Sequence, residues 1–209
     1  MKTPSLINTT AWFSLIGAVG LLIWWFLMPV FLPVADAANN FHNMILDPDW
    51  TWLNLAGLVS TLLVTLGFPA FSLYQKENLD RLGSAGFVIA STGLILFTGI
   101  QYYETLLWPA AASVDPGLVG ATGALVSGDP GVAGGLLASG ILLGAGYILF
   151  GISALLANLL PKTPLWFLIV GAPVFANGII FPVRTLGLLL FCAGTIWLAL
   201  RLRKNLLKA

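Results

Sequence analysis

Long runs of apolar residues, each close to the length that crosses a bilayer, dominate this chain. A spanning helix needs about 20 mainly apolar residues, and the sequence contains six such stretches. They cover approximately residues 11–32, 50–74, 86–108, 131–160, 165–181 and 183–200. Little more than Pro182 separates the last two, which predicts a tight helical hairpin. We therefore expect an all-α, polytopic membrane protein: one domain of six transmembrane helices.

Charged side chains are too scarce to cover the surface of a soluble fold of this length. Hydrophobic residues make up 58% of the 209-residue chain and charged residues only 8%, against roughly 25% charged in a typical soluble domain. This composition excludes a soluble enzyme, a nucleic-acid-binding protein and a disordered tail. The single cysteine excludes an intrachain disulfide scaffold. The lipid bilayer is therefore the expected partner of most of the surface, and nucleic acid is not expected.

Lysine and arginine are distributed very unevenly over the two ends of the expected spans. Six crossings would place the N-terminus, the 75–85 loop, the 161–164 turn and the C-terminal tail on one side. Of the 9 basic residues, all but Arg184 fall on that side. Loops rich in Lys and Arg are retained in the cytoplasm. We therefore predict that both termini are cytoplasmic and that this is a multi-pass protein of the cell membrane.

The segment between the third and fourth spans, residues 109–130, consists mostly of small residues. Asp115-Pro116 and Asp129-Pro130 each have the pattern of a helix start, with Asp as the N-cap and Pro in the first turn. We expect a short surface helix around 116–125, followed by the fourth span. Two interpretations of the segment are open: a lid over an external pocket, or a simple connector.

Small residues recur along the fourth span. Gly131, Gly135 and Ser139 have four-residue spacing, and Gly140 and Gly144 follow. In lipid, this pattern lets helix backbones approach closely. It predicts close packing, either within one subunit or at the face of a homodimer.

Polar residues inside the expected spans are few, and the strongest of them lie at one depth. Glu104 is the only acidic residue within a span, and Gln101 lies one helical turn before it. Arg184 lies at the outer start of the sixth span. Because buried polar groups are costly in a bilayer, they are candidates for function. The candidate ligand-binding residues are Glu104, Gln101, Arg184, Asn177, Asn54 and Tyr103.

Two arrangements of these residues are open. In the first, Glu104 pairs with Arg184 and the amide side chains line a small polar cavity that opens outwards, because each charge alone would be costly at this depth. In the second, both charges reach the headgroups and cap helix ends. Thr98, Gln101 and Thr105 share a helix face with Glu104. This polar stripe is expected to face protein rather than lipid.

Residue patterns of known catalytic or metal sites are missing. His42 is the only histidine, so one subunit cannot supply a bis-histidine haem, and no zinc-ligand spacing surrounds it. Ser139 followed by Gly140 is similar to the nucleophile region of rhomboid proteases, but residues 183–200 contain no histidine that would act as the base. We predict no catalytic residue and no metal ligand, and the sequence does not identify a cofactor.

The function that these features favour is non-enzymatic. We expect either a subunit of a membrane complex or a binder of a lipophilic small molecule in the outer leaflet. The expected partners are the bilayer, such a molecule, and further copies of the chain or other membrane subunits. The alternative is a small transporter or channel with Glu104 as a coupling carboxylate, although the inner halves of the spans carry little beyond Ser and Thr. An intramembrane enzyme that uses Glu104 as acid or base is a third interpretation.

Overall fold

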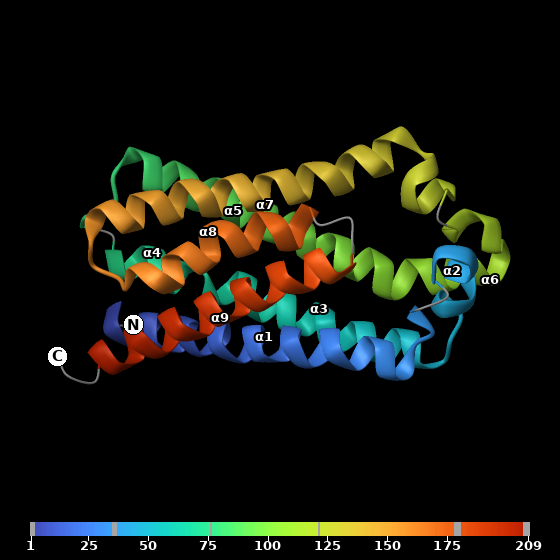
Figure 1. Ribbon diagram of the computed structural model, residues 1–209, viewed down its shortest axis with the longest axis horizontal. Coiled ribbons are helices and arrows are strands. Elements are labelled where there is room, and N and C mark those ends of the chain that lie inside the picture. The colour runs from blue at the N-terminus through green and yellow to red at the C-terminus, as the bar shows by residue number, and fades with distance from the viewer. Residues whose placement is uncertain (1–2, 35–36, 76, 121, 178–180, 207–209) are drawn as a thin grey trace.

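The computed structural model describes residues 3–34, 37–75, 77–120, 122–177 and 181–206. Within these ranges the chain is helical and has no strand. Figure 1 shows the long helices side by side in one bundle. The elements are α1 (Thr3–Phe31), α2 (Ala37–Ile45), α3 (Asp49–Gly67), α4 (Pro69–Gln75), α5 (Arg81–Tyr102), η2 (Tyr103–Leu107), α6 (Trp108–Val114), η3 (Pro116–Val119), η4 (Ala124–Gly128), α7 (Pro130–Ala157), α8 (Lys162–Asn177) and α9 (Phe181–Leu206).

Among the described residues, five helices are long and apolar enough to cross a membrane, which indicates a multi-pass membrane protein. They are Pro4–Phe31, Asp49–Gln75, Arg81–Val114, Pro130–Ala157 and Phe181–Leu206. The expected span at 165–181 corresponds to α8, which has 16 residues and extends about 24 Å at 1.5 Å per residue. It is thus shorter than the hydrocarbon core of about 30 Å. Residues 178–180, which follow it, lie outside the described part of the chain.

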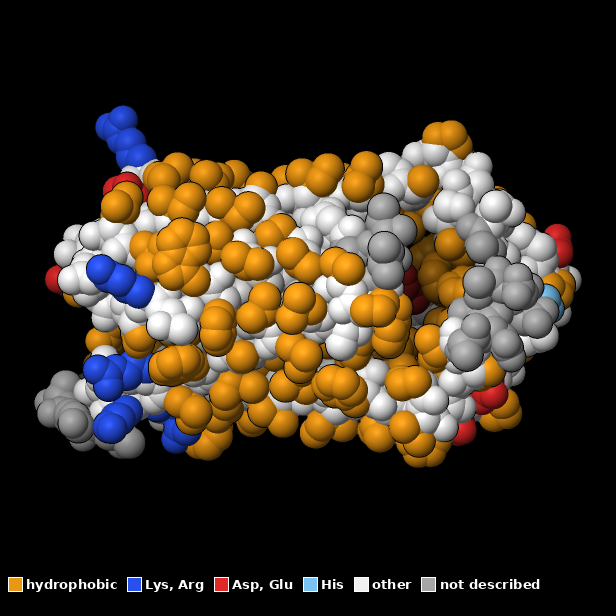
Figure 2. Space-filling model, viewed as in Figure 1, with side chains coloured by type: hydrophobic (Ala, Val, Ile, Leu, Met, Phe, Trp, Pro, Cys, Tyr) orange, Lys and Arg blue, Asp and Glu red, His pale blue; other side chains and the backbone are white. Residues whose placement is uncertain are grey.

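The beginning of α1 and the end of α9 meet at one end of the bundle, which we call the terminal end (Figure 1). Arg203 donates from Nε to Asn8 Oδ1 at 3.4 Å, and its guanidinium lies 3.4 Å from the ring centroid of Trp12. Asn205 Nδ2 donates to the Tyr74 hydroxyl at 3.0 Å, which ties α9 to α4. Figure 2 shows Lys and Arg side chains gathered at this end together with a few acidic ones, whereas the far end of the same face shows acidic side chains and no Lys or Arg.

Helix boundaries follow the capping residues of the sequence. The Asp129 carboxylate accepts hydrogen bonds from the first backbone N–H groups of α7, and Asp115 caps η3 in the same way. Both predicted Asp-Pro starts are therefore confirmed. The single helix expected over 116–125 is wrong, because two short turns, η3 and η4, take its place. The expected 50–74 span is divided into α3 and α4 just before Pro69, which has no backbone N–H to donate.

The far end of the bundle, which we call the capped end, is covered by α2, α6, η3 and η4. Trp108 Nε1 and the Tyr103 hydroxyl both donate to the Leu125 carbonyl at 3.2 Å. Trp108 also packs against Trp50 and Phe41, with ring centroids 6.2 and 5.5 Å apart. The 109–130 segment is thus folded onto an aromatic cluster by specific hydrogen bonds.

Helices α5 and α7 approach backbone to backbone near the middle of the bundle. A Cβ atom built at Gly146 would overlap the backbone of Ala90, and one built at Gly93 would overlap the backbone of Leu143. Nearer the beginning of α7, Gly140 and Gly144 approach α8 closely. Packing within the subunit, one of the two predictions for the small-residue pattern, is therefore confirmed for these two glycines.

Packing within the subunit is wrong for Gly135 and Gly131, and the alternative, a homodimer face, stays a prediction for them. A Cβ at Gly135 would meet no atom within 4 Å, and one at Gly131 would meet only the side chain of Asp129. Both glycines are exposed at the surface of α7. The beginning of α7 therefore presents bare backbone on the outside of the bundle.

Asp80, in the loop before α5, joins two helices at the terminal end. Its carboxylate accepts a hydrogen bond from Ser153 Oγ of α7 at 2.6 Å and one from the backbone N–H of Gly83 at 2.8 Å. The Ser153 bond first, and the Gly83 bond second, lower the pKa of Asp80 from its ordinary value of 3.8.

We expect Asp80→Asn to lower the midpoint of thermal unfolding at neutral pH, because an amide accepts both bonds more weakly than a carboxylate. A carboxyl group with a lowered folded-state pKa stabilises the fold above its unfolded pKa, and this contribution is lost as pH falls through the folded-state pKa. The difference between wild type and Asp80→Asn should therefore shrink below about pH 4. Melting curves at neutral and acidic pH measure it, and a difference that stays constant over this range would contradict the assignment.

Candidate functional site

Glu104 lies on a π-helical turn, η2, that interrupts the helix between α5 and α6. Three contacts hold this turn: the Trp50 indole donates to the Glu104 carbonyl at 3.1 Å, Gln101 Nε2 donates to Glu104 Oε2 at 3.1 Å, and the Thr105 hydroxyl donates to the Gln101 carbonyl. A π-turn adds one residue to a helical turn and is frequent at functional sites. The extra residue changes the direction in which the side chains after Tyr102 point from the helix axis.

The Glu104 side chain faces a small cavity, which we call the polar cavity. Its volume is about 170 Å³. It is lined by Phe97, Ile100, Gln101, Glu104, Leu136, Ser139, Ala176 and Arg184. Helices α5, α7, α8 and α9 and the η2 turn thus all contribute to it. Figure 2 shows a hollow toward the capped end with acidic side-chain atoms deep inside it.

Arg184, on the first turn of α9 (Phe181–Leu206), also lines this cavity. Its guanidinium lies over two aromatic rings, 5.4 Å from the Trp25 centroid and 5.6 Å from that of Phe175. Such cation–π contacts help to hold a cation away from water. Its charge and that of Glu104 lie close enough to attract each other, although among the described residues no nitrogen–oxygen contact of 4.0 Å or less joins them. The predicted pair is thus two opposite charges that face one cavity without touching.

Two buried polar atoms at the cavity have no hydrogen-bond partner among the described residues. They are Gln101 Oε1, an acceptor, and Arg184 Nε, a donor. Gln101 is only 3% exposed. A buried polar group without a partner costs about 1–3 kcal/mol, so such atoms are rare in folded proteins. Both atoms have almost no exposed surface, so they are buried beside the cavity and do not face it.

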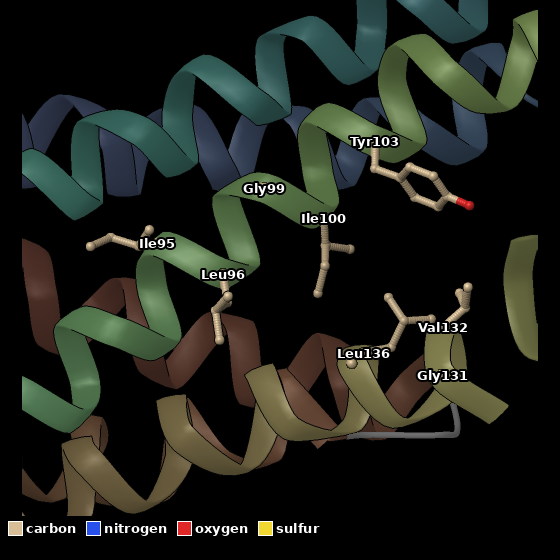
Figure 3. A pocket seen from close by; sticks show the side chains of 9 residues that line it. Ile95, Leu96, Gly99, Ile100, Tyr103, Gly131, Val132 and Leu136 are labelled. Carbon is tan, nitrogen blue, oxygen red and sulfur yellow. The ribbon is translucent and has the colours of Figure 1, made fainter.

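An apolar groove lies beside the polar cavity, between α5 and α7 (Figure 3). Its volume is about 480 Å³. The residues that line it are Ile95, Leu96, Gly99, Ile100, Tyr103, Gly131, Val132, Gly135 and Leu136. Because a Cβ at Gly99 or Gly135 would meet no atom within 4 Å, the groove exists where these side chains are missing. Ile100 and Leu136 line both spaces, so the polar cavity and the groove share a wall.

The structure brings together four of the six predicted ligand-binding residues. Glu104, Gln101 and Arg184 line the polar cavity, and Tyr103 lines the groove. The other two, Asn54 and Asn177, are not lining residues of either space.

Both of these amides donate to backbone carbonyls instead. Asn54 Nδ2 donates to Trp50 O at 3.0 Å. Asn177 Nδ2 donates to Gly140 O and to Pro173 O, each at 3.0 Å, so it links α8 to α7. These contacts are typical of amides that satisfy helix backbone inside a membrane protein.

Sequence reasoning missed the groove and the polar role of Ser139. Ser139 lines the polar cavity, where its hydroxyl donates to the Leu136 carbonyl at 2.8 Å. The four-residue spacing of Gly131, Gly135 and Ser139 was the available signal, since it places all three on one face of α7. That face is the one that the groove and the cavity use.

The described residues contain no group of three or more His, Cys, Asp or Glu side chains that would hold a metal ion. No protein-family model, curated protein or solved structure matches the chain.

Proposed function

We propose that this protein binds a lipophilic ligand in the outer leaflet of the cell membrane. The polar part of the ligand would occupy the polar cavity and its hydrocarbon part the groove. One observation carries the proposal: a cavity lined by the charged residues Glu104 and Arg184 shares a wall with an apolar groove on the bundle surface. A site with convergent polar groups beside apolar walls is typical of small-molecule binding.

The proposal includes six crossings, with both termini in the cytoplasm. The contacts of Arg203 with Asn8 and Trp12 support an even number, since they join the beginning of α1 to the end of α9. With α8 as the short sixth crossing, the basic terminal end faces the cytoplasm. The capped end, the polar cavity and the groove then lie toward the outer leaflet.

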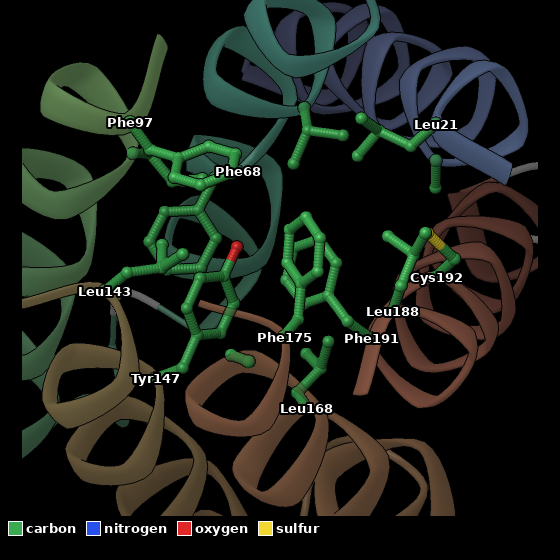
Figure 4. Packing of buried hydrophobic residues seen from close by; sticks show 14 of the residues in the cluster. Leu21, Phe68, Phe97, Leu143, Tyr147, Leu168, Phe175, Leu188, Phe191 and Cys192 are labelled. Atoms are coloured by element: carbon green, nitrogen blue, oxygen red, sulfur yellow. The ribbon is translucent and has the colours of Figure 1, made fainter. Parts of the chain in front are cut away.

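A transporter or channel, the alternative function, has less support. Aromatic and aliphatic side chains pack against one another between the helices of the bundle (Figure 4). Phe97 packs on Phe175, which stacks on Phe191, and Phe191 packs on Tyr147, with centroid distances of 5.5, 6.1 and 5.3 Å. A conduction path needs polar or water-lined groups along its length. This packing favours a site that ends inside the bundle.

Blocking the groove tests the function without disturbing the core. In Gly135→Leu the new side chain enters the groove, whereas in Gly134→Leu it enters equally open space on the same helix but outside the groove lining. We expect native mass spectrometry of the wild type and of Gly134→Leu, purified in mild detergent, to detect one bound small molecule. Occupancy in Gly135→Leu should fall at least about tenfold, since tenfold corresponds to only 1.4 kcal/mol of lost binding.

Equal occupancy in both leucine variants would contradict the proposal, as would a wild-type protein that carries no small molecule. A wild-type complex with a second protein that Gly135→Leu dissociates would assign the groove to a partner helix instead. Both variants should melt at the wild-type temperature once ligand is removed, because neither glycine has a neighbour that a leucine would displace from the core.

A further inference from the structure

An open surface pocket lies on α9 at the terminal end, at the opposite end of this helix from Arg184. Its volume is about 300 Å³, and it is lined by Trp197, Leu200, Arg201 and Lys204. All four side chains are exposed. Their spacing of three and four residues places them on one face of the helix. The pocket, which we call the basic pocket, thus combines two cationic groups with an apolar floor.

Neither cation of the basic pocket has a partner in the described part of the chain. No carboxylate oxygen lies within 4.0 Å of the side-chain nitrogens of Arg201 or Lys204, and these nitrogens donate no hydrogen bond there. Arg203, which lies between them in the sequence, differs: its guanidinium contacts Asn8 and the ring of Trp12. Contacts within the protein therefore account for the position of Arg203 but not for the two cations of the pocket.

The Trp197 ring is supported from the side of α8 and is open on the side of the pocket. Phe167 packs edge-on against it, with ring centroids 6.5 Å apart, and 46% of Trp197 remains exposed. Tryptophan side chains at the end of a spanning helix lie at the level of the lipid head groups. Arg201 follows one helical turn later, about 6 Å farther along the axis. Its charge therefore lies at the depth where lipid phosphates are found.

The charge of the lining decides which kind of lipid suits the basic pocket. Both ionisable residues among the described lining residues are positive. The ammonium group of a zwitterionic lipid would be repelled by these two cations, whereas the head group of an anionic lipid carries no positive charge. Guanidinium and ammonium groups form strong, charge-assisted hydrogen bonds to phosphate oxygens. The pocket thus favours an anionic phospholipid, and its apolar floor suits the upper part of an acyl chain.

We infer that the basic pocket binds one anionic phospholipid of the surrounding leaflet. The Arg201 guanidinium and the Lys204 ammonium donate to its phosphate oxygens, and an acyl chain lies against Trp197 and Leu200. This inference does not depend on the proposed function, because it concerns the other end of the bundle. It is also narrower than the general attraction of a basic protein end to an anionic membrane surface, since it assigns the lipid to one face of α9.

A competition between two lipids tests the inference. Phosphatidylglycerol and phosphatidylcholine with identical acyl chains are mixed in equal amounts with the delipidated protein in mild detergent, and native mass spectrometry measures the retained lipid. We expect the wild type to retain phosphatidylglycerol over phosphatidylcholine at least about tenfold, since each basic residue near a lipid phosphate contributes roughly fivefold. In Arg201→Gln/Lys204→Gln the preference should fall to about twofold or less. This variant should melt with the wild type, because both side chains are exposed.

Arg81→Gln/Lys162→Gln is the matched control. It removes two exposed positive charges from the same end of the bundle and leaves the basic pocket intact, so it should keep the preference. An equal loss in both double variants would show general attraction to the basic end and would overturn the inference. Equal retention of the two lipids by the wild type would overturn it as well.

Two further arms identify the occupant and its place. Glycerol phosphate in excess should not displace phosphatidylglycerol, because it lacks the chain that contacts Trp197 and Leu200. Displacement would assign the pocket to a free anion and would overturn the inference. Gly135→Leu, which blocks the groove at the other end, should keep the preference for phosphatidylglycerol. If the preference were lost there, the anionic lipid would belong to the groove and not to the basic pocket.

Discussion

Arg184→Met should destabilise the protein by about 1–3 kcal/mol, because it leaves the Glu104 carboxylate near the polar cavity without an opposite charge. The guanidinium also lies over Trp25 and Phe175, so its loss removes two cation–π contacts. Unfolding in detergent, followed by dye labelling of buried Cys192, measures the change. Lys162→Met is the matched control: Lys162 is exposed at the terminal end, and its replacement should change stability by no more than about 0.5 kcal/mol.

The double variant distinguishes a coupled pair from two independent charges. Glu104→Gln in the Arg184→Met background removes the uncompensated charge, so the double variant should be more stable than the sum of the two single losses. We expect a coupling of about 1–3 kcal/mol. Arg184→Lys keeps the charge but not the planar group, and should recover part of the loss. Strictly additive losses would show that each charge is stabilised separately, and the attraction across the cavity would be rejected.

The sequence was sufficient to predict the charged residues of the polar cavity. Glu104 and Arg184 stand out because charged residues are so rare in apolar stretches, and both face the cavity. The stripe that accompanies Glu104 also faces protein: Thr98 bonds to Thr65 of α3 at 3.0 Å, and Gln101 is buried. Polar side chains are costly to expose to lipid and therefore face the interior of the bundle. Hydropathy alone was enough to find these positions.

The sequence could not predict which amides would join them. Asn54 and Asn177 lie in the expected half of the bundle, but helix rotation decides whether an amide faces a cavity or its own backbone, and packing against neighbouring helices sets that rotation. The π-turn at Tyr103–Leu107 is a further obstacle, since it changes the helical phase that a regular 3.6-residue period assumes.

The groove escaped prediction for a different reason. It is defined by side chains that are missing, at Gly99 and Gly135, and the same glycine spacing also fits close helix packing. Only the separation of α5 and α7 distinguishes the two outcomes. At Gly146 and Gly93 the backbones touch, whereas from Ile95 toward Tyr103 and from Leu136 toward Gly131 the helices line an open groove.

We therefore expect a large loss of stability when the α5–α7 contact is forced apart. In Gly146→Ala the new methyl group would overlap the backbone of Ala90, which is fully buried and cannot move aside as a flexible side chain would. Overpacking of this kind costs about 1–3 kcal/mol, and Gly146→Leu should cost more. Gly134→Ala is the matched control, since its methyl group would meet no neighbouring atom. The measurement is again the unfolding midpoint in detergent.

The same change should also weaken ligand binding, because the contact at Gly146 sets how α5 and α7 diverge toward the groove. Widening it moves Ile100 relative to Leu136, the two residues that join the groove to the polar cavity. Gly146→Ala should thus retain less of the bound small molecule than Gly134→Ala at a temperature where both are folded. A Gly146→Ala protein that melts with the wild type and keeps its ligand would mean that the helices separate there at no cost, and that the groove is not shaped by this contact.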